Sequence, residues 1–332
     1  MVYQSFLDSD TEVSVEALVP SLSEVWAKKY VGKVAARNET LTKRDERSCK
    51  DDVVQCLTSK LRSVSAQAWN KTESLLKDEM ERHDIDQDLI DPWKISKDIH
   101  QIFEKTITAY SNYVTPGRFS VLVSKNIGDI RRQYTAVDPR VIGFVSMQFH
   151  YCGQLLLKNA PESETTTLQQ YFKVIDDHLY MPLQRAYEAA GNYTYDNPRL
   201  RTVQALLPNC TTIAHSIVQR VNQLYPNYTC YSGRLDSEPV RISSVRDVEM
   251  FQIYLWTSVL ERNISAIAQE LFPLCVMLYP TFNVNWELVR QMISLMEKAF
   301  IQCVEPEQIK YYQPYHRALW KMFSPEVFPE SL

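Results

Sequence analysis

Apolar residues recur at intervals of three and four positions along most of the chain, which is the spacing of one face of an α-helix. Asn, Asp, Ser and Pro residues separate these stretches, and such residues start or stop helices. The helical stretches are residues 21–37, 52–82, 95–110, 139–158, 162–190, 197–208, 209–224, 244–262, 264–279, 284–302 and 306–323. The pattern predicts an all-α protein, a multi-helix globular bundle of about ten helices with little or no β-sheet.

The stretch 139–158 is the most apolar of these helices. Asp138-Pro139 is a strong start signal, because an N-cap acid is followed by proline at the first helical position. Phe144 and Phe149 lie five positions apart, so a narrow apolar stripe cannot hold both of them. We therefore expect this helix to be buried broadly, at the centre of the fold. The alternation of Phe119, Val121 and Val123 with other residues predicts one short strand.

Glycine is scarce, with 7 residues among 332, where average usage is roughly 7%. A chain with so few glycines can hardly build a glycine-rich nucleotide loop. The charge distribution suggests two parts. We predict an N-terminal helical region over residues 1–125, with a long charged helix, and a C-terminal helical core domain over residues 126–332.

The net charge of −4 gives no sign of the basic face that nucleic-acid binding usually requires. No apolar run reaches the roughly 18–20 residues of a membrane span. The first residues do not resemble a secretion signal, and the seven cysteines include no C-x-x-C pair. These features predict a cytoplasmic protein with free thiols, without a nucleic-acid partner or a membrane span.

No catalytic motif emerges from the sequence, and we predict no catalytic residue, no metal ligand and no cofactor. The densest group of ligand-type residues is Asp176, Asp177 and His178. Neighbouring side chains on a helix point about 100° apart, so these three do not converge on one ion. The sequence therefore favours a protein without enzymatic activity.

One enzymatic alternative stays open. Asp176-Asp177 resembles in part the D-D-x-x-D motif with which terpene synthases, which are also all-helical, hold magnesium. Tyr180 stands where that motif has its third aspartate, and Asn263, Ser265 and Glu270 are at the wrong steps for the second metal motif. A magnesium-dependent enzyme similar to a terpene synthase is the second alternative.

Three arginines flank the predicted helix start at Pro139, namely Arg131, Arg132 and Arg140. Arginines near a helix N-terminus can bind an anion or the carboxylate of a partner. The other interpretation is pairing within the chain, for example with Asp129 or Asp138.

The segment 225–243 is predicted to be a long loop between helices, where connections usually take about two to eight residues. It carries tyrosines and arginines, which are enriched at binding hot spots. We predict a partner-binding surface formed by Tyr228, Tyr231, Arg234 and Arg241. The leading interpretation is accordingly a regulatory or scaffold protein that binds another protein, with a homo-oligomer as one possible form.

The first alternative is a helical domain that binds a tetrapyrrole or another hydrophobic ligand. Globins and phycobiliproteins hold tetrapyrroles between helices. A covalently bound bilin needs a cysteine for its thioether and a nearby aspartate for its pyrrole nitrogens. Cys49 and Asp52 have such a spacing, although in a charged segment. His150, on the most apolar helix, is the best candidate for a haem ligand.

Overall fold

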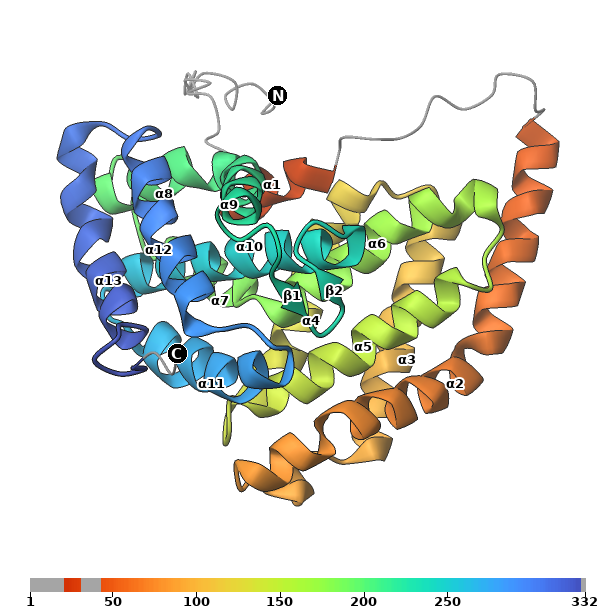
Figure 1. Ribbon diagram of the computed structural model, residues 1–332. Coiled ribbons are helices and arrows are strands. Elements are labelled where there is room, and N and C mark those ends of the chain that lie inside the picture. The colour runs from red at the N-terminus through yellow and green to blue at the C-terminus, as the bar shows by residue number, and fades with distance from the viewer. Residues whose placement is uncertain (1–20, 31–42, 330–332) are drawn as a thin grey trace, which may run out of the picture.

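The computed structural model describes residues 21–30 and 43–329, with side chains described from Lys50 onward in the second range, and its fold is all-α (Figure 1). The α-helices are α1 (Leu22–Ala27), α2 (Lys43–Arg82), α3 (Pro92–Ser111), α4 (Pro116–Thr135), α5 (Val141–Leu157), α6 (Glu162–Tyr180), α7 (Leu183–Ala190), α8 (Pro198–Leu206), α9 (Cys210–Leu224), α10 (Glu238–Glu261), α11 (Phe272–Thr281), α12 (Trp286–Ile301) and α13 (Ile309–Met322). The prediction of a multi-helix bundle with little sheet is confirmed.

Short elements complete the described chain. The 3₁₀ segments are η1 (Lys28–Tyr30), η2 (Gln87–Leu89), η3 (Leu207–Asn209) and η5 (Pro306–Gln308), and η4 (Ala266–Leu271) is a π-helix. The strands β1 (Thr229–Cys230) and β2 (Gly233–Arg234) pair antiparallel in one small hairpin. Gly233 has a φ of 130°, a backbone conformation that favours glycine, so one of the few glycines lies where a turn requires it.

Several helices begin at the signals that the sequence carries. The side chains of Asp91, Thr115 and Asn197 accept hydrogen bonds from backbone N–H groups of the first turn, and proline follows each of them. An N-cap side chain satisfies a backbone donor that has no partner within the helix, and proline at the first position loses no hydrogen bond. The starts of these helices are therefore determined by residues next to them in the sequence.

Three sequence predictions about local structure are wrong. Helix α5 begins at Val141 with Arg140 as its N-cap, and not at Pro139 after a capping Asp138. The stretch around Val121 is not a strand, because helix α4 runs through it. Phe119, Val123 and Ile127 are buried at four-residue spacing, and this helical period outweighs the short alternation. The loop predicted over 225–243 is also shorter, since α10 begins at Glu238 and the hairpin occupies part of the remainder.

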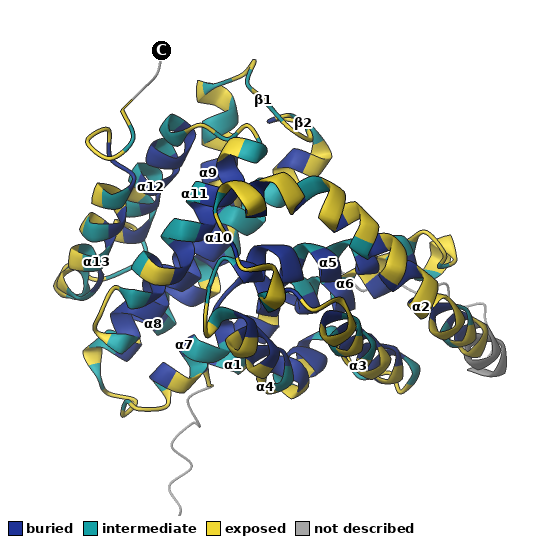
Figure 2. Ribbon diagram, turned by 90° about the horizontal axis from the view of Figure 1, so that it is seen from below, coloured by how far each residue is buried: buried dark blue, intermediate teal, exposed yellow. Residues whose placement is uncertain are grey.

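Helix α5 lies within the core, between α2 on one side and α4 and α6 on the other, and both Phe144 and Phe149 are buried. The prediction of broad burial holds for this helix. The C-terminal half of α10 also lies within the core, because every residue from Val248 to Leu260 is buried. Figure 2 shows buried ribbon along both helices and exposed ribbon along the outer side of α2.

The predicted division at residues 125 and 126 falls inside α4. One connected set of buried apolar side chains extends from Leu22 to Phe323 across that position. The division into two parts stays a prediction. Among the described residues, no helix is long and apolar enough to cross a membrane.

The burial of Phe144 leads to a stability prediction. Its ring packs edge-on against Trp69 of α2, with 5.1 Å between ring centroids. Phe144→Ala should reduce the free energy of unfolding by about 3–5 kcal/mol, because it leaves a cavity in the core. Leu122→Ala, at an exposed position of α4, is the control and should change it by less than about 0.5 kcal/mol. Equal effects of both substitutions in urea unfolding would contradict the placement of α5.

Candidate functional site

Four helices surround an open cleft with a volume of about 1270 Å³. One side is formed by the C-terminal half of α5 and by α6, and the other by α9 and the first half of α10. Its apolar lining includes Leu157, Phe172, Val218, Ile242 and Val245. The lining between them is polar and charged.

Two fully buried carboxylates form the floor of this cleft, Asp177 from α6 and Glu249 from α10. The Lys29 ammonium, from η1, is 3.2 Å from Asp177 Oδ2 and 2.9 Å from Glu249 Oε1. The Lys173 ammonium, from α6, is 3.0 Å from Asp177 Oδ1 and 3.7 Å from Glu249 Oε2. Two negative charges therefore face two positive charges, and we call these four residues the floor quartet.

The helical period determines where the acidic triplet points. Lys173 and Asp177 lie four positions apart, which places them on the same face of α6. Asp176 turns toward α5 instead, where its Oδ2 is 2.8 Å from Nδ1 of His150. The His178 ring is buried, with its Nδ1 at the carbonyl of Val174. The three consecutive side chains therefore diverge, and no group of three such ligands in the described residues could hold a metal ion.

The ionisation of Asp177 follows from its neighbours. Burial would raise the pKa of this carboxyl, but the Lys173 and Lys29 ammonium groups and a hydrogen bond from Tyr30 hold the pKa well below its usual range. Burial alone lowers the pKa of a lysine, yet Asp177 and Glu249 raise that of Lys173. The floor therefore stays ionic at neutral pH.

Some charged atoms at the cleft lack partners within the described chain. Glu249 Oε1 accepts from Lys29 and from the Thr211 hydroxyl, whereas its buried Oε2 accepts no hydrogen bond. The side chain of the exposed Arg241 forms no hydrogen bond or ion pair with the other described residues. The Arg246 guanidinium lies 4.3 Å from the centre of the Tyr180 ring, and its buried Nε has no acceptor. The cleft thus offers the guanidinium groups of Arg241 and Arg246, of which the second lies 3.8 Å from Asp247 Oδ1, whereas Glu249 Oε2 is buried 3.7 Å from the Lys173 ammonium.

The three arginines predicted to contact an anion are each held by a carboxylate of this chain. Arg131 is buried, with its Nη2 2.8 Å from Glu270 Oε2 and a hydrogen bond to the Tyr254 hydroxyl. Arg132 pairs with Glu188 at 2.7 Å and also lies 3.8 Å from Asp129. Arg140 pairs with Asp138 at 2.6 Å and donates to the carbonyl of His83.

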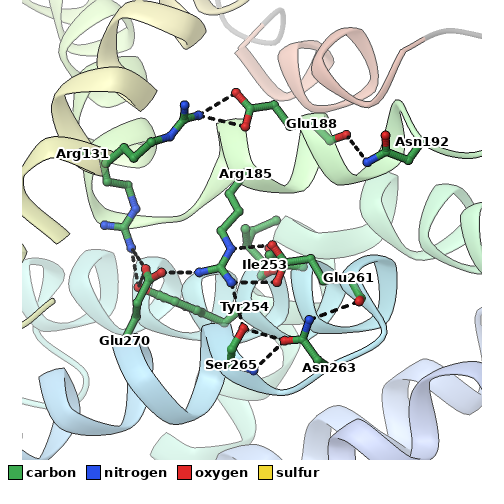
Figure 3. Close-up of polar contacts among 12 residues, drawn as sticks. Arg131, Arg185, Glu188, Asn192, Ile253, Tyr254, Glu261, Asn263, Ser265 and Glu270 are labelled. Atoms are coloured by element: carbon green, nitrogen blue, oxygen red, sulfur yellow. Dashed lines mark hydrogen bonds and ion pairs between the residues drawn. The ribbon is translucent and has the colours of Figure 1, made fainter. Parts of the chain in front are cut away.

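Arg185 extends this network, as Figure 3 shows. Its guanidinium lies between Glu261, at 2.5 and 2.7 Å, and Glu270, and it also donates to the hydroxyl of Ser265. Glu270, which lies in the π-helix η4, therefore joins two arginines. The network borders a separate pocket of about 410 Å³ that Arg131, Arg132 and Arg185 line and Arg140 does not.

The two sets of residues that resemble terpene-synthase motifs are not brought together. Asp176 and Asp177 line the cleft, where His150 and two lysines hold them. Asn263 hydrogen-bonds to Ser265, beside the Arg185 network. Basic side chains therefore stand at both places where the resemblance would put magnesium.

The four residues predicted to bind a partner are spread over different surfaces. The Tyr228 hydroxyl donates to the carbonyl of Asn283 and accepts from the N–H of Asn285. These two hydrogen bonds hold the hairpin against the connection between α11 and α12. Tyr231 is 65% exposed and its ring lies edge-on against that of Phe282. Arg234 pairs with Asp236. Arg241 alone of the four lines the cleft.

The residues weighed for a tetrapyrrole also lie apart. The side chain of Cys49 is outside the described residues, and Asp52 is exposed on α2. His150 lines the cleft. None of the six described cysteines lines it, and none forms a disulfide. Cys230 and Asp247 line a pocket of only about 80 Å³ between the hairpin, α9, α10 and α12.

Residues 170–321 match the family model described as Phycobilisome: Phycobilisome protein. The matched segment is less than half of the 332 residues, begins within α6 and ends within α13. It contains the cleft walls from α6, α9 and α10, but neither α5 nor Lys29. Comparison with curated proteins and with solved structures finds no match. The similarity favours a tetrapyrrole-binding helical domain over the leading interpretation of a protein-binding module.

Sequence reasoning missed Lys29, Lys173 and Glu249 as parts of a site. The i,i+4 spacing of Lys173 and Asp177 was a visible signal for one ion pair. No local pattern indicates the contact between Lys29 and Glu249, because 220 positions separate them.

The neighbouring Arg131 and Arg132 give a matched pair of substitutions. Arg131→Met should lower the free energy of unfolding by about 1.5–3 kcal/mol, because it removes one of the two arginines that pair with the buried Glu270 carboxylate. The Arg132 side chain is 59% exposed, so Arg132→Met should cost less than about 1 kcal/mol. Chemical denaturation of both variants measures the difference. A loss below about 1 kcal/mol for Arg131→Met would show that the network does not depend on this residue.

Proposed function

We propose that this chain binds a tetrapyrrole non-covalently in the cleft between α5, α6, α9 and α10. The observation that carries this proposal is a cleft with an apolar lining and two guanidinium groups, formed mostly by a segment similar to phycobilisome proteins. Pockets for drug-sized ligands measure about 300–1,000 Å³, so the cleft has room for a ligand of this size.

The donor and acceptor groups of the cleft suit the chemistry of a tetrapyrrole. Such a ligand has an apolar conjugated body, pyrrole N–H donors and two carboxylate side chains. The apolar lining, with Phe172 and Val245, would contact the body. Arg241 and Arg246 would bind the carboxylates, because a guanidinium matches a carboxylate in charge and shape.

The described cysteines do not support a covalent link at this place. Cys152 precedes the cleft-lining residue Gly153, but its thiol is buried and burial raises its pKa to about 12. A thiol in such surroundings is inert, because the thiolate is the reactive form. Cys230 lies in a pocket too small for a tetrapyrrole. The proposed binding is therefore reversible.

Titration of the purified chain with biliverdin, an open-chain tetrapyrrole, tests this function. Binding should saturate at one equivalent and change the visible absorption of the pigment. Arg241→Ala should weaken binding by about tenfold, or about 1.4 kcal/mol, because it removes a carboxylate contact. Arg118→Ala, at an exposed position of α4, is the control and should bind as the wild type does. Equal affinities of the two variants would contradict the proposed cleft, and no saturable binding to the wild type would contradict the function.

The exposed end of the hairpin supports a second candidate function, contact with another protein chain. Tyr231 is 65% exposed although it is a large aromatic side chain, and its backbone N–H is fixed to the carbonyl of Phe282. A rigid, partly apolar tyrosine is favoured at interfaces. We propose that this tyrosine contacts a second copy of the chain. The cytoplasmic location and the absence of a nucleic-acid partner also stay predictions.

Sedimentation velocity measures this self-association directly. The wild type should form dimers at micromolar concentration, and Tyr231→Ala should shift it toward monomers without moving the melting temperature by more than a few degrees. Tyr195→Ala removes a similarly exposed tyrosine elsewhere and should leave the dimer intact. A wild type that stays monomeric throughout would rule out the second copy as partner.

A further inference from the structure

The segment Leu22–Tyr30 contacts the buried floor carboxylates through Lys29 and Tyr30, although it lies far from the matched region in sequence and does not line the cleft. The Trp26 indole N–H donates to the Tyr30 hydroxyl at 3.0 Å, and that hydroxyl donates to Asp177 Oδ2 at 2.7 Å. The Lys29 ammonium lies 3.8 Å from the centre of the Trp26 ring. Two buried aromatic side chains therefore hold the Lys29 ammonium against the floor carboxylates.

The charge balance of the floor depends on this lysine. With Lys29 present, two ammonium groups face two carboxylates. Without it, Lys173 alone would face both Asp177 and Glu249. The Lys173 side chain is 41% exposed and the Lys29 side chain only 12%, so the Lys29 charge is less screened by water and acts more strongly on the buried pair.

We propose that Lys29 is a positioning residue that sets the charge of the cleft floor, so that segment Leu22–Tyr30 determines whether the cleft accepts an anionic tetrapyrrole. This inference rests on the proposed function. Loss of the ammonium leaves one excess negative charge below the ligand. That charge repels the ligand carboxylates.

Further titratable groups surround the pair from each adjoining element, and none replaces Lys29. Tyr187 and Cys210 are neutral at physiological pH, because burial raises their pKa values. His178 is neutral too, because burial lowers its pKa to about 4. The charged or titratable groups around Asp177 and Glu249 are Lys29 and Tyr30 of η1, Lys173, Asp176 and His178 of α6, Tyr187 of α7, Cys210 of α9 and Arg246 of α10.

Biliverdin affinity of Lys29→Met, measured between about pH 6 and about pH 8, tests the inference. The variant should bind about tenfold more weakly than the wild type across this range, because the excess negative charge repels the ligand carboxylates. Lys29→Arg should restore most of the binding at pH 8. Lys28→Met removes an adjacent, exposed lysine and should match the wild type at every pH. Wild-type affinity of Lys29→Met throughout this range would overturn the inference.

A stability measurement separates this inference from the proposed function. If the wild type does not bind biliverdin, the proposed function fails. Thermal unfolding of the variants still tests whether Lys29 balances the charge of the floor carboxylates. Lys29→Met should lower the melting temperature, and adding Glu249→Gln should recover much of the loss, because the floor is neutral again. A double variant no more stable than Lys29→Met would show that Lys29 acts by packing and not by charge. If Lys29→Met folds poorly, the double variant should fold better, and this comparison still tests the charge balance.

Discussion

The burial of two carboxylates where α6 and α10 approach each other is the constraint on which the centre of this molecule depends. Asp177 and Glu249 have no exposed side-chain surface, and a buried charge without a partner destabilises a protein by several kcal/mol. Lys173 supplies one counter-charge from within α6. Lys29 supplies the other from the N-terminal segment, which must therefore lie against the bundle.

The helices could be predicted from the sequence because their signals are local. The apolar period and the N-cap residue before Pro198 involve neighbours a few positions apart. The same kind of signal before Pro92 and Pro116 was not recognised as a helix start. The strand expected near Val121 failed because its alternation was short and one helical face was longer. The loop 225–243 was overestimated because α10 begins with Glu238 and Pro239, ahead of its apolar residues.

The candidate site could be predicted only in part. The sequence analysis singled out His150 as a haem ligand and Arg241 as a partner-binding residue, and both line the cleft. Nothing in the sequence indicated that they would share one cleft. Asp138 and Arg140 lie two positions apart, so their pairing was visible as an alternative. Arg131 and Glu270 are 139 positions apart, and that distance is closed only by the tertiary fold. Ion pairs of this kind carry no periodic pattern, which is why the floor of the cleft was missed.

The similarity to phycobilisome proteins and the geometry of the cleft together imply a composite site. The matched segment 170–321 supplies three walls, whereas α5 and Lys29 come from the remainder of the chain. Hydrogen–deuterium exchange with and without biliverdin tests this claim most directly. The account predicts added protection in α6, α9, the first half of α10 and the α5 segment around His150. Protection confined to the hairpin, or no change in any of these helices, would contradict it.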